Sequence, residues 1–187
     1  MKYEHAIRQA LLDNSIRIVA EGGFECATTR AITYGGEVID GVSMNDANIY
    51  RIFGGKDGLF DSAFELIEER FAELVCDSLD DGENIRKVIR YLLEFWTENP
   101  LWCRYYIRYC YSQRLSGKVR EKHDGALDRI AGHAEDYFAP DTPVKLIMHI
   151  LLTAVTDMAF QNITGKAVAN KKSAVDALTR IVKAYLR

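Results

Sequence analysis

The chain has 187 residues, of which 48% are hydrophobic and 27% charged, a balance typical of a globular protein and unlike that of a disordered segment. It contains no uninterrupted run of about 18 apolar residues and no signal-peptide core at its start, so we expect a cytoplasmic protein without a membrane-spanning helix. The formal net charge is −3, which provides no general excess of cations for nucleic acid. The four cysteines lack CxxC spacing, and we expect buried free thiols, no metal site and no cofactor.

The N-terminal third of the chain shows helical periodicity interrupted by glycine pairs. Helices are predicted over residues 4–21, 29–34, 46–53 and 57–79. Gly22-Gly23 ends the first of these segments, as glycines after a helix commonly do. Thr28 is suited to cap the second helix with its hydroxyl group.

The rest of the chain is also helical by pattern, without the alternation that is typical of strands. Further helices are predicted over residues 83–98, 101–114, 117–138, 143–163 and 171–186. The sequence therefore predicts an all-α protein of about nine helices.

Two short helices, the first of them capped, are typical of a helix-turn-helix, in which the second helix lies in the major groove of DNA. The stretch Ala27-Thr28-Thr29-Arg30-Ala31-Ile32, together with the segment Ile49 to Phe60, resembles the DNA-binding head of tetracycline repressor-like (TetR-family) transcriptional regulators. The resemblance covers residues 5–64 and implies a three-helix head, residues 1–55, joined to a larger ligand-binding and dimerisation body, residues 56–187.

The resemblance also implies which residues contact DNA. Thr28, Thr29 and Arg30 stand where the family contacts phosphate or a base, Tyr50 where an aromatic ring touches the backbone, and Lys56 where a lysine binds a phosphate. Asn45 would cap the recognition helix, and Asn48 would be placed to pair with adenine. The predicted DNA contacts are Thr28, Thr29, Arg30, Asn45, Ala47, Asn48, Tyr50, Arg51 and Lys56.

The connector between the two short helices departs from the family pattern. Fourteen residues separate Arg30 from Asn45, which is longer than the family's usual turn. The family's Gly-Val-Ser turn aligns either with Ser43-Met44-Asn45 or with Gly41-Val42-Ser43. Glu37 and Asp40 add negative charge to this loop, and the first sixty residues carry six cations against eight carboxylates.

Aromatic residues in the body suggest a pocket for a flat or apolar small molecule. The candidate ligand-binding residues are Phe95, Trp96, Trp102, Tyr105, Tyr106, Tyr109 and His123. The other interpretation is that the rings form ordinary core. Arg104 and Arg108, one helical turn apart, either bind an anionic effector or belong to a solvated face.

The last two predicted helices, 143–163 and 171–186, are too apolar for a small domain to cover alone. Pairing with a second copy would bury them in a four-helix bundle, so we expect a homodimer. His149, Thr153 and Asp157 form a polar line along the first of these helices, which indicates either this interface or a ligand contact.

These features predict a ligand-responsive regulator that binds a double-stranded DNA operator, a repressor that a small-molecule effector releases. The alternative is a dimeric small-molecule sensor or interaction module whose modified head no longer binds DNA specifically. No ExxH pair or nucleophile–base constellation is visible in the sequence, so we do not expect an enzyme.

Overall fold

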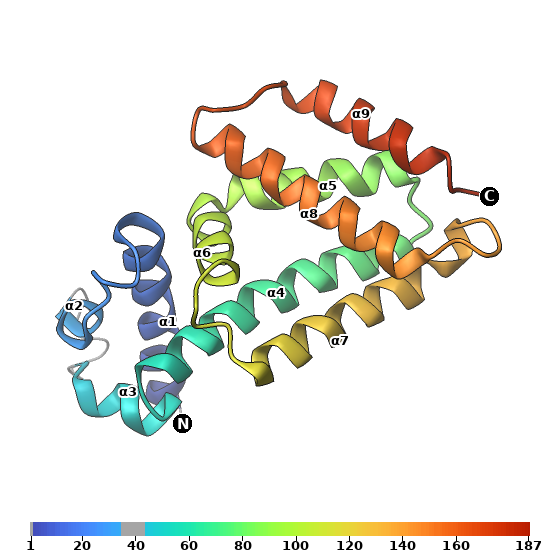
Figure 1. The fold of residues 1–187 in the computed structure, drawn as a ribbon. Coiled ribbons are helices and arrows are strands. Elements are labelled where there is room, and N and C mark those ends of the chain that lie inside the picture. Colours follow the sequence, from blue (N-terminus) through green and yellow to red (C-terminus); the bar gives the residue numbers. More distant parts are fainter. Residues whose placement is uncertain (1, 35–43) are drawn as a thin grey trace. The chain divides into compact units, whose positions relative to one another are not determined.

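The computed structural model describes residues 2–34 and 44–187, and these residues are all-α, as predicted (Figure 1). Within these ranges the helices are α1 Lys2–Gly22, α2 Thr29–Tyr34, α3 Asp46–Phe53, α4 Lys56–Asp80, α5 Ile85–Glu98, α6 Pro100–Cys110, α7 Gly117–Ala134, the 3₁₀ turn η1 Glu135–Tyr137, α8 Val144–Ile163 and α9 Lys171–Lys183. Each predicted segment corresponds to one α-helix, and α2 and α3 have the predicted bounds.

Three helices end earlier than predicted, because local hydrogen bonds replace the helical ones. Helix α7 stops at Ala134 and is followed by the 3₁₀ turn η1, after which the Phe138 amide donates to the Glu135 carbonyl. Helix α6 stops at Cys110, where the Ser112 hydroxyl donates to the Tyr109 carbonyl at 2.8 Å and accepts from the Arg114 amide at 3.1 Å. Helix α9 stops at Lys183, where the chain turns to pair with residues 137–139. Phe138 and Leu186 form an isolated antiparallel bridge there.

The packing of the chain forms two compact units. The first unit comprises Met1–Ile67 and Arg104–Val119, and the second comprises Glu68–Cys103 and Arg120–Arg187. Helices α4, α6 and α7 therefore contribute to both units. The functional division into a DNA-binding and a ligand-binding part stays a prediction.

In the first unit, α1, α2 and α3 pack against one another (Figure 1). Their apolar faces meet in a core in which Leu11, Ile32 and Ile49 are fully buried. Beside it, Phe24 meets the Phe60 ring edge-on at 5.2 Å, and the Tyr105 hydroxyl donates to the Phe60 carbonyl at 2.9 Å. This packing fixes the orientation of α3 within the unit.

In the second unit, α5 packs against both α8 and α9 (Figure 1). Trp96, Met148 and Val155 are fully buried between these helices. The side of α5 that bears Ile85, Val88, Ile89, Leu92, Leu93 and Trp96 is buried. An amphipathic helix buried along one face in this way is typical of a helical bundle.

Helix α8 is the one helix in the described residues that is long and apolar enough to cross a membrane, with a mean hydropathy of 1.3 over its best window. Polar residues such as His149 and Asp157 interrupt the apolar run that the sequence would need, but the average hydropathy of the helix tolerates them. Only 28% of the window is buried in this chain. Leu146 and Ile150 are 55% and 51% exposed, so α8 presents apolar residues on a second face.

Candidate nucleic-acid interface

Helix α2 is fixed at both ends by side-chain hydrogen bonds. The Thr28 hydroxyl accepts from the Ala31 amide at 3.1 Å, which confirms the predicted N-cap. The Asn14 side chain of α1 donates to the Ile32 carbonyl at 3.0 Å, in the last turn of α2. The cap places Thr28 and Arg30 on the surface at the start of this helix, where both are exposed.

Helix α3 begins with a reciprocal capping box between two asparagines. The Asn48 amide donates to the Asn45 side chain at 3.1 Å, and the Asn45 amide donates to the Asn48 side chain at 3.0 Å. The predicted cap by Asn45 is confirmed. The same contact engages the Asn48 oxygen, so bidentate pairing with adenine requires this oxygen to accept a second hydrogen bond.

A contact that sequence reasoning missed joins the two short helices. The Thr33 hydroxyl of α2 lies 3.0 Å from the Thr29 carbonyl and 3.4 Å from the Asp46 carboxylate of α3. Met44, just before α3, is buried. The Thr33–Asp46 contact therefore links α2 to the first turn of α3. The predicted loop, with Glu37, Asp40 and the Gly41-Val42-Ser43 alignment, lies outside the described residues.

The predicted DNA contacts are gathered on the surface of α2 and α3. Exposed side chains are those of Thr28, Arg30, Asn45, Ala47, Tyr50 and Arg51, whereas Thr29, Asn48 and Lys56 are half-buried. Tyr50 is 63% exposed although it lies beside the buried Ile49. The ring is therefore not part of the core of the head and is accessible for a contact outside the chain.

Two of the predicted cations make contacts within the chain. The Arg51 guanidinium donates to the Glu4 carboxylate of α1 at 3.1 Å. The Lys56 ammonium lies 5.9 Å from the centre of the Phe60 ring. Because the Arg51–Glu4 pair is more than half exposed, solvent weakens it, and a phosphate can compete for the arginine.

Glycines set the turn between α3 and α4. Gly54 is the C-cap of α3 at φ 75°, and its amide donates to the Tyr50 carbonyl at 2.9 Å. A Cβ at Gly58, in the first turn of α4, would lie 2.0 Å from the Phe53 carbonyl oxygen. Helix α4 lies so close to the end of α3 that only glycine, which has no Cβ, fits at position 58.

The candidate ligand-binding residues fall into two groups, one in each unit. In the first unit, Tyr109 stacks on Phe64 at 4.5 Å and donates its hydroxyl to Asp61. In the second, Trp96 lies 4.9 Å from Phe95. Tyr105 and Tyr106 belong to the first group, and Trp102 and His123 to the second. Tyr105, Tyr109 and Trp96 are fully buried, which fits the core interpretation of these rings, and their role in ligand binding stays a prediction.

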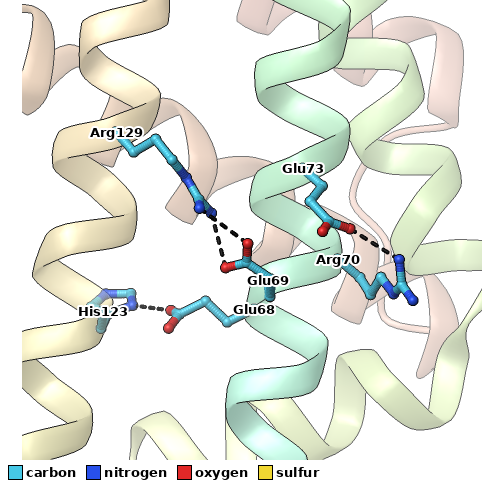
Figure 2. Close-up of polar contacts among 6 residues, drawn as sticks. All are labelled: Glu68, Glu69, Arg70, Glu73, His123 and Arg129. Atoms are coloured by element: carbon cyan, nitrogen blue, oxygen red, sulfur yellow. Dashed lines mark hydrogen bonds and ion pairs between the residues drawn. The ribbon is translucent and has the colours of Figure 1, made fainter.

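His123 lies on a polar contact surface between α7 and α4 within the second unit (Figure 2). Its Nδ1 atom forms a hydrogen bond with the carboxylate of Glu68, which is 7% exposed. One turn and a half further along α7, Arg129 donates twice to Glu69, at 3.0 and 2.9 Å (Figure 2). The hydrogen bond to Glu68 raises the pKa of His123 above its ordinary value, although burial opposes the shift.

This raised pKa predicts a pH dependence of stability. The folded state binds the His123 proton more tightly than the unfolded state, so the pair stabilises the fold most below the ordinary pKa of 6.5. The contribution is lost as the pH rises through the raised pKa. Urea unfolding from pH 6 to pH 9 should show the wild type losing its advantage over His123→Gln as the pH increases. A stability difference that is the same at every pH would contradict this assignment.

The comparisons with known proteins begin with two negative results. No protein-family model matches the sequence, and no curated protein matches it. Solved structures do match. A TetR family transcription regulator from Marinobacter aquaeolei VT8 is 17% identical with a TM-score of 0.75, covering 99% of this chain and 98% of that one.

Two further structures agree with this match. A TetR-like transcriptional regulator from Rhodococcus sp. RHA1 is 22% identical with a TM-score of 0.67, covering 95% of this chain and 93% of that one. A TetR-family transcriptional regulator from Pectobacterium atrosepticum is 18% identical with a TM-score of 0.65, covering 99% and 96% of the two chains.

This chain has the TetR fold. The sequence resembles that family only over residues 5–64, whereas the TetR fold extends over nearly the whole chain. In the body the helix arrangement is similar to that of these structures, although the sequence identity is low. Within the TetR fold, the roles of individual DNA-contact and ligand-contact residues stay predictions.

Proposed function

We propose that this protein is a DNA-binding transcriptional regulator that responds to a small molecule, a repressor that its effector releases from the operator. The observation that carries the proposal is the exposed face of α2 and α3 in a chain with the TetR fold. Solved structures similar to it include TetR-family and TetR-like transcription regulators.

The proposed DNA contacts combine exposed side chains of α2 and α3 with the half-buried Lys56 and Asn48. Arg30 and Lys56 supply positive charge for phosphates, and the Tyr50 ring lies against the sugar–phosphate backbone. Ala47, next to Asn45 and Asn48 at the start of α3, faces the bases. Its small side chain suits contact with a thymine methyl group.

Control by a ligand requires two heads held at a set spacing. The exposed residues Leu146 and Ile150 of α8, Ile181 of α9 and Tyr185 just after α9 support a dimer through these helices. Such a dimer would present two α3 helices to half-sites one helical turn apart. A ligand that binds one head spacing better than the other would shift the dimer toward or away from the operator.

The alternative, a dimeric sensor whose head does not bind DNA specifically, also has support. Arg51 is paired with Glu4, the Asn48 oxygen is used in the capping box, and Asp46 is exposed at the start of α3. Each of these reduces the attraction of α3 for DNA. The two proposals differ in whether cations of the head affect DNA affinity.

Fluorescence-anisotropy titration against the DNA upstream of the protein's own gene separates them. Arg30→Ala and Lys56→Ala should each weaken binding by about tenfold, because each removes a phosphate or base contact. Arg17→Ala is the matched control, since Arg17 is an exposed α1 cation paired with Glu21 at 3.8 Å and outside the α2–α3 face. It should leave the affinity unchanged.

The outcomes are distinct. Loss of affinity in the Arg30 and Lys56 variants alone supports the regulator. Equal affinity in all four proteins, or no binding above that to an unrelated duplex, supports the alternative sensor.

A further inference from the structure

A groove between α5 and α9 in the second unit contains an unusual concentration of cations. Its volume is about 390 Å³, within the size range of small-molecule sites. The groove is lined by Arg86, Lys87, Arg90, Glu94, Lys171, Lys172 and Val175. Five of these seven residues are cationic, in a chain whose formal net charge is −3.

Ion pairs between the two helices connect the groove walls. Arg86 of α5 pairs with Asp176 of α9, and Lys171 of α9 pairs with Glu94 of α5 at 2.5 Å. Because α5 and α9 run antiparallel, these two pairs lie at opposite ends of the groove. The two ion pairs hold α5 and α9 together, and their carboxylates partly neutralise the cations at each end of the groove.

The middle of the groove keeps its positive charge. The Arg90 guanidinium lies 5.1 Å from the centre of the neighbouring Tyr91 ring, a contact that leaves its charge in place. Lys172 is exposed, and Lys87 pairs at 2.8 Å with Glu83, a residue outside the lining. The five cations therefore face three carboxylates, those of Glu83, Glu94 and Asp176.

Four of the cations also stand where they weaken their own helices. Arg86 and Lys87 lie in the first turn of α5, and Lys171 and Lys172 in the first turn of α9. Neither first turn contains an acidic residue. The positive end of a helix dipole disfavours cations and favours anions. Because the two helices run antiparallel, their first turns lie at opposite ends of the groove, and an anion near either end would relieve the repulsion at that end.

We propose that this groove binds a small organic anion with two or more negative charges, carried by phosphate or carboxylate groups. Arg90 can bind such a group through two parallel hydrogen bonds, while Lys172 and Lys87 act as point charges beside it. The Val175 side chain and the alkyl parts of the cationic side chains provide apolar surface for the rest of the ligand. The site lies within one unit and does not depend on DNA binding by the head.

Isothermal titration calorimetry on the full chain tests the site with two probes, pyrophosphate and citrate, at constant ionic strength. The double variant Arg90→Gln/Lys172→Gln should raise the Kd by about tenfold or more, because charge-assisted hydrogen bonds are lost. The matched control Arg120→Gln/Lys183→Gln removes the same charge from exposed positions outside the groove and should leave the Kd unchanged. Both variants alter exposed or half-buried surface residues, and unchanged thermal unfolding would show that they fold.

The two probes distinguish the ligand chemistries. Tighter binding of pyrophosphate assigns the groove to phosphate groups, and equal or tighter binding of citrate assigns it to carboxylates. Absence of binding by both probes, or an equal loss of affinity in the control variant, would overturn the proposal.

Discussion

Gly58→Ala is expected to destabilise the protein by about 2 kcal/mol or more, because overpacking typically costs about 1–3 kcal/mol and the clash here is with backbone. The added Cβ would lie 2.0 Å from the Phe53 carbonyl oxygen, so α3 and α4 would have to separate. Thermal unfolding followed by circular dichroism should show a lower Tm, by about 4 °C or more for a chain of this size.

Gly125→Ala on α7 is the matched control. Gly125 is exposed within its helix, and a Cβ there would meet nothing within 4 Å. Because alanine favours the helix, this change should stabilise the protein by about 0.5–1 kcal/mol. If the two alanines had the same effect on the Tm, the close approach at Gly58 would not be a constraint.

Leu146→Glu/Ile150→Glu is expected to convert a dimer into a monomer. Both residues are more than half exposed in the single chain and lie one turn apart on α8. In the proposed dimer they would be buried, and two carboxylates in an apolar interface have no partners to offset their desolvation. Size-exclusion chromatography with light scattering should give about twice the monomer mass for the wild type and the monomer mass for the variant.

The control for this prediction is Val168→Glu. Val168 is 87% exposed, and it lies in the connector between α8 and α9 rather than on either helix. The same chemical change at this position should leave the dimer intact. A wild type that is already monomeric at micromolar concentration would contradict the proposed interface.

Local sequence signals predicted the secondary structure because their causes are local. Thr28 and Asn45 are capping residues, and each accepts the expected hydrogen bond from a backbone amide. The glycine pair at 54 and 55 ends α3 for the same reason, since Gly54 adopts a positive φ. The early end of α6 was missed because the Ser112 hydroxyl provides an alternative to helical hydrogen bonding.

Features that depend on distant residues were not predictable from the pattern. The aromatic rings predicted to form one pocket divide between two units, because α6 contributes to both. The pairing of Arg51 with Glu4 joins residues of α3 and α1, and no spacing rule indicates it. The cationic groove combines two short basic clusters, Arg86-Lys87 and Lys171-Lys172, and each alone is typical of a solvated surface.

The central claim is that the exposed face of α2 and α3 binds DNA, and the salt dependence of DNA affinity tests it most directly. Titration of the wild-type protein with upstream DNA at several salt concentrations should give a linear fall in the logarithm of the association constant, with a slope steeper than about −3 if four or more phosphates are neutralised. Affinity should also exceed that for a scrambled duplex at every salt concentration. A slope near zero, or equal affinity for the scrambled duplex, would contradict the account.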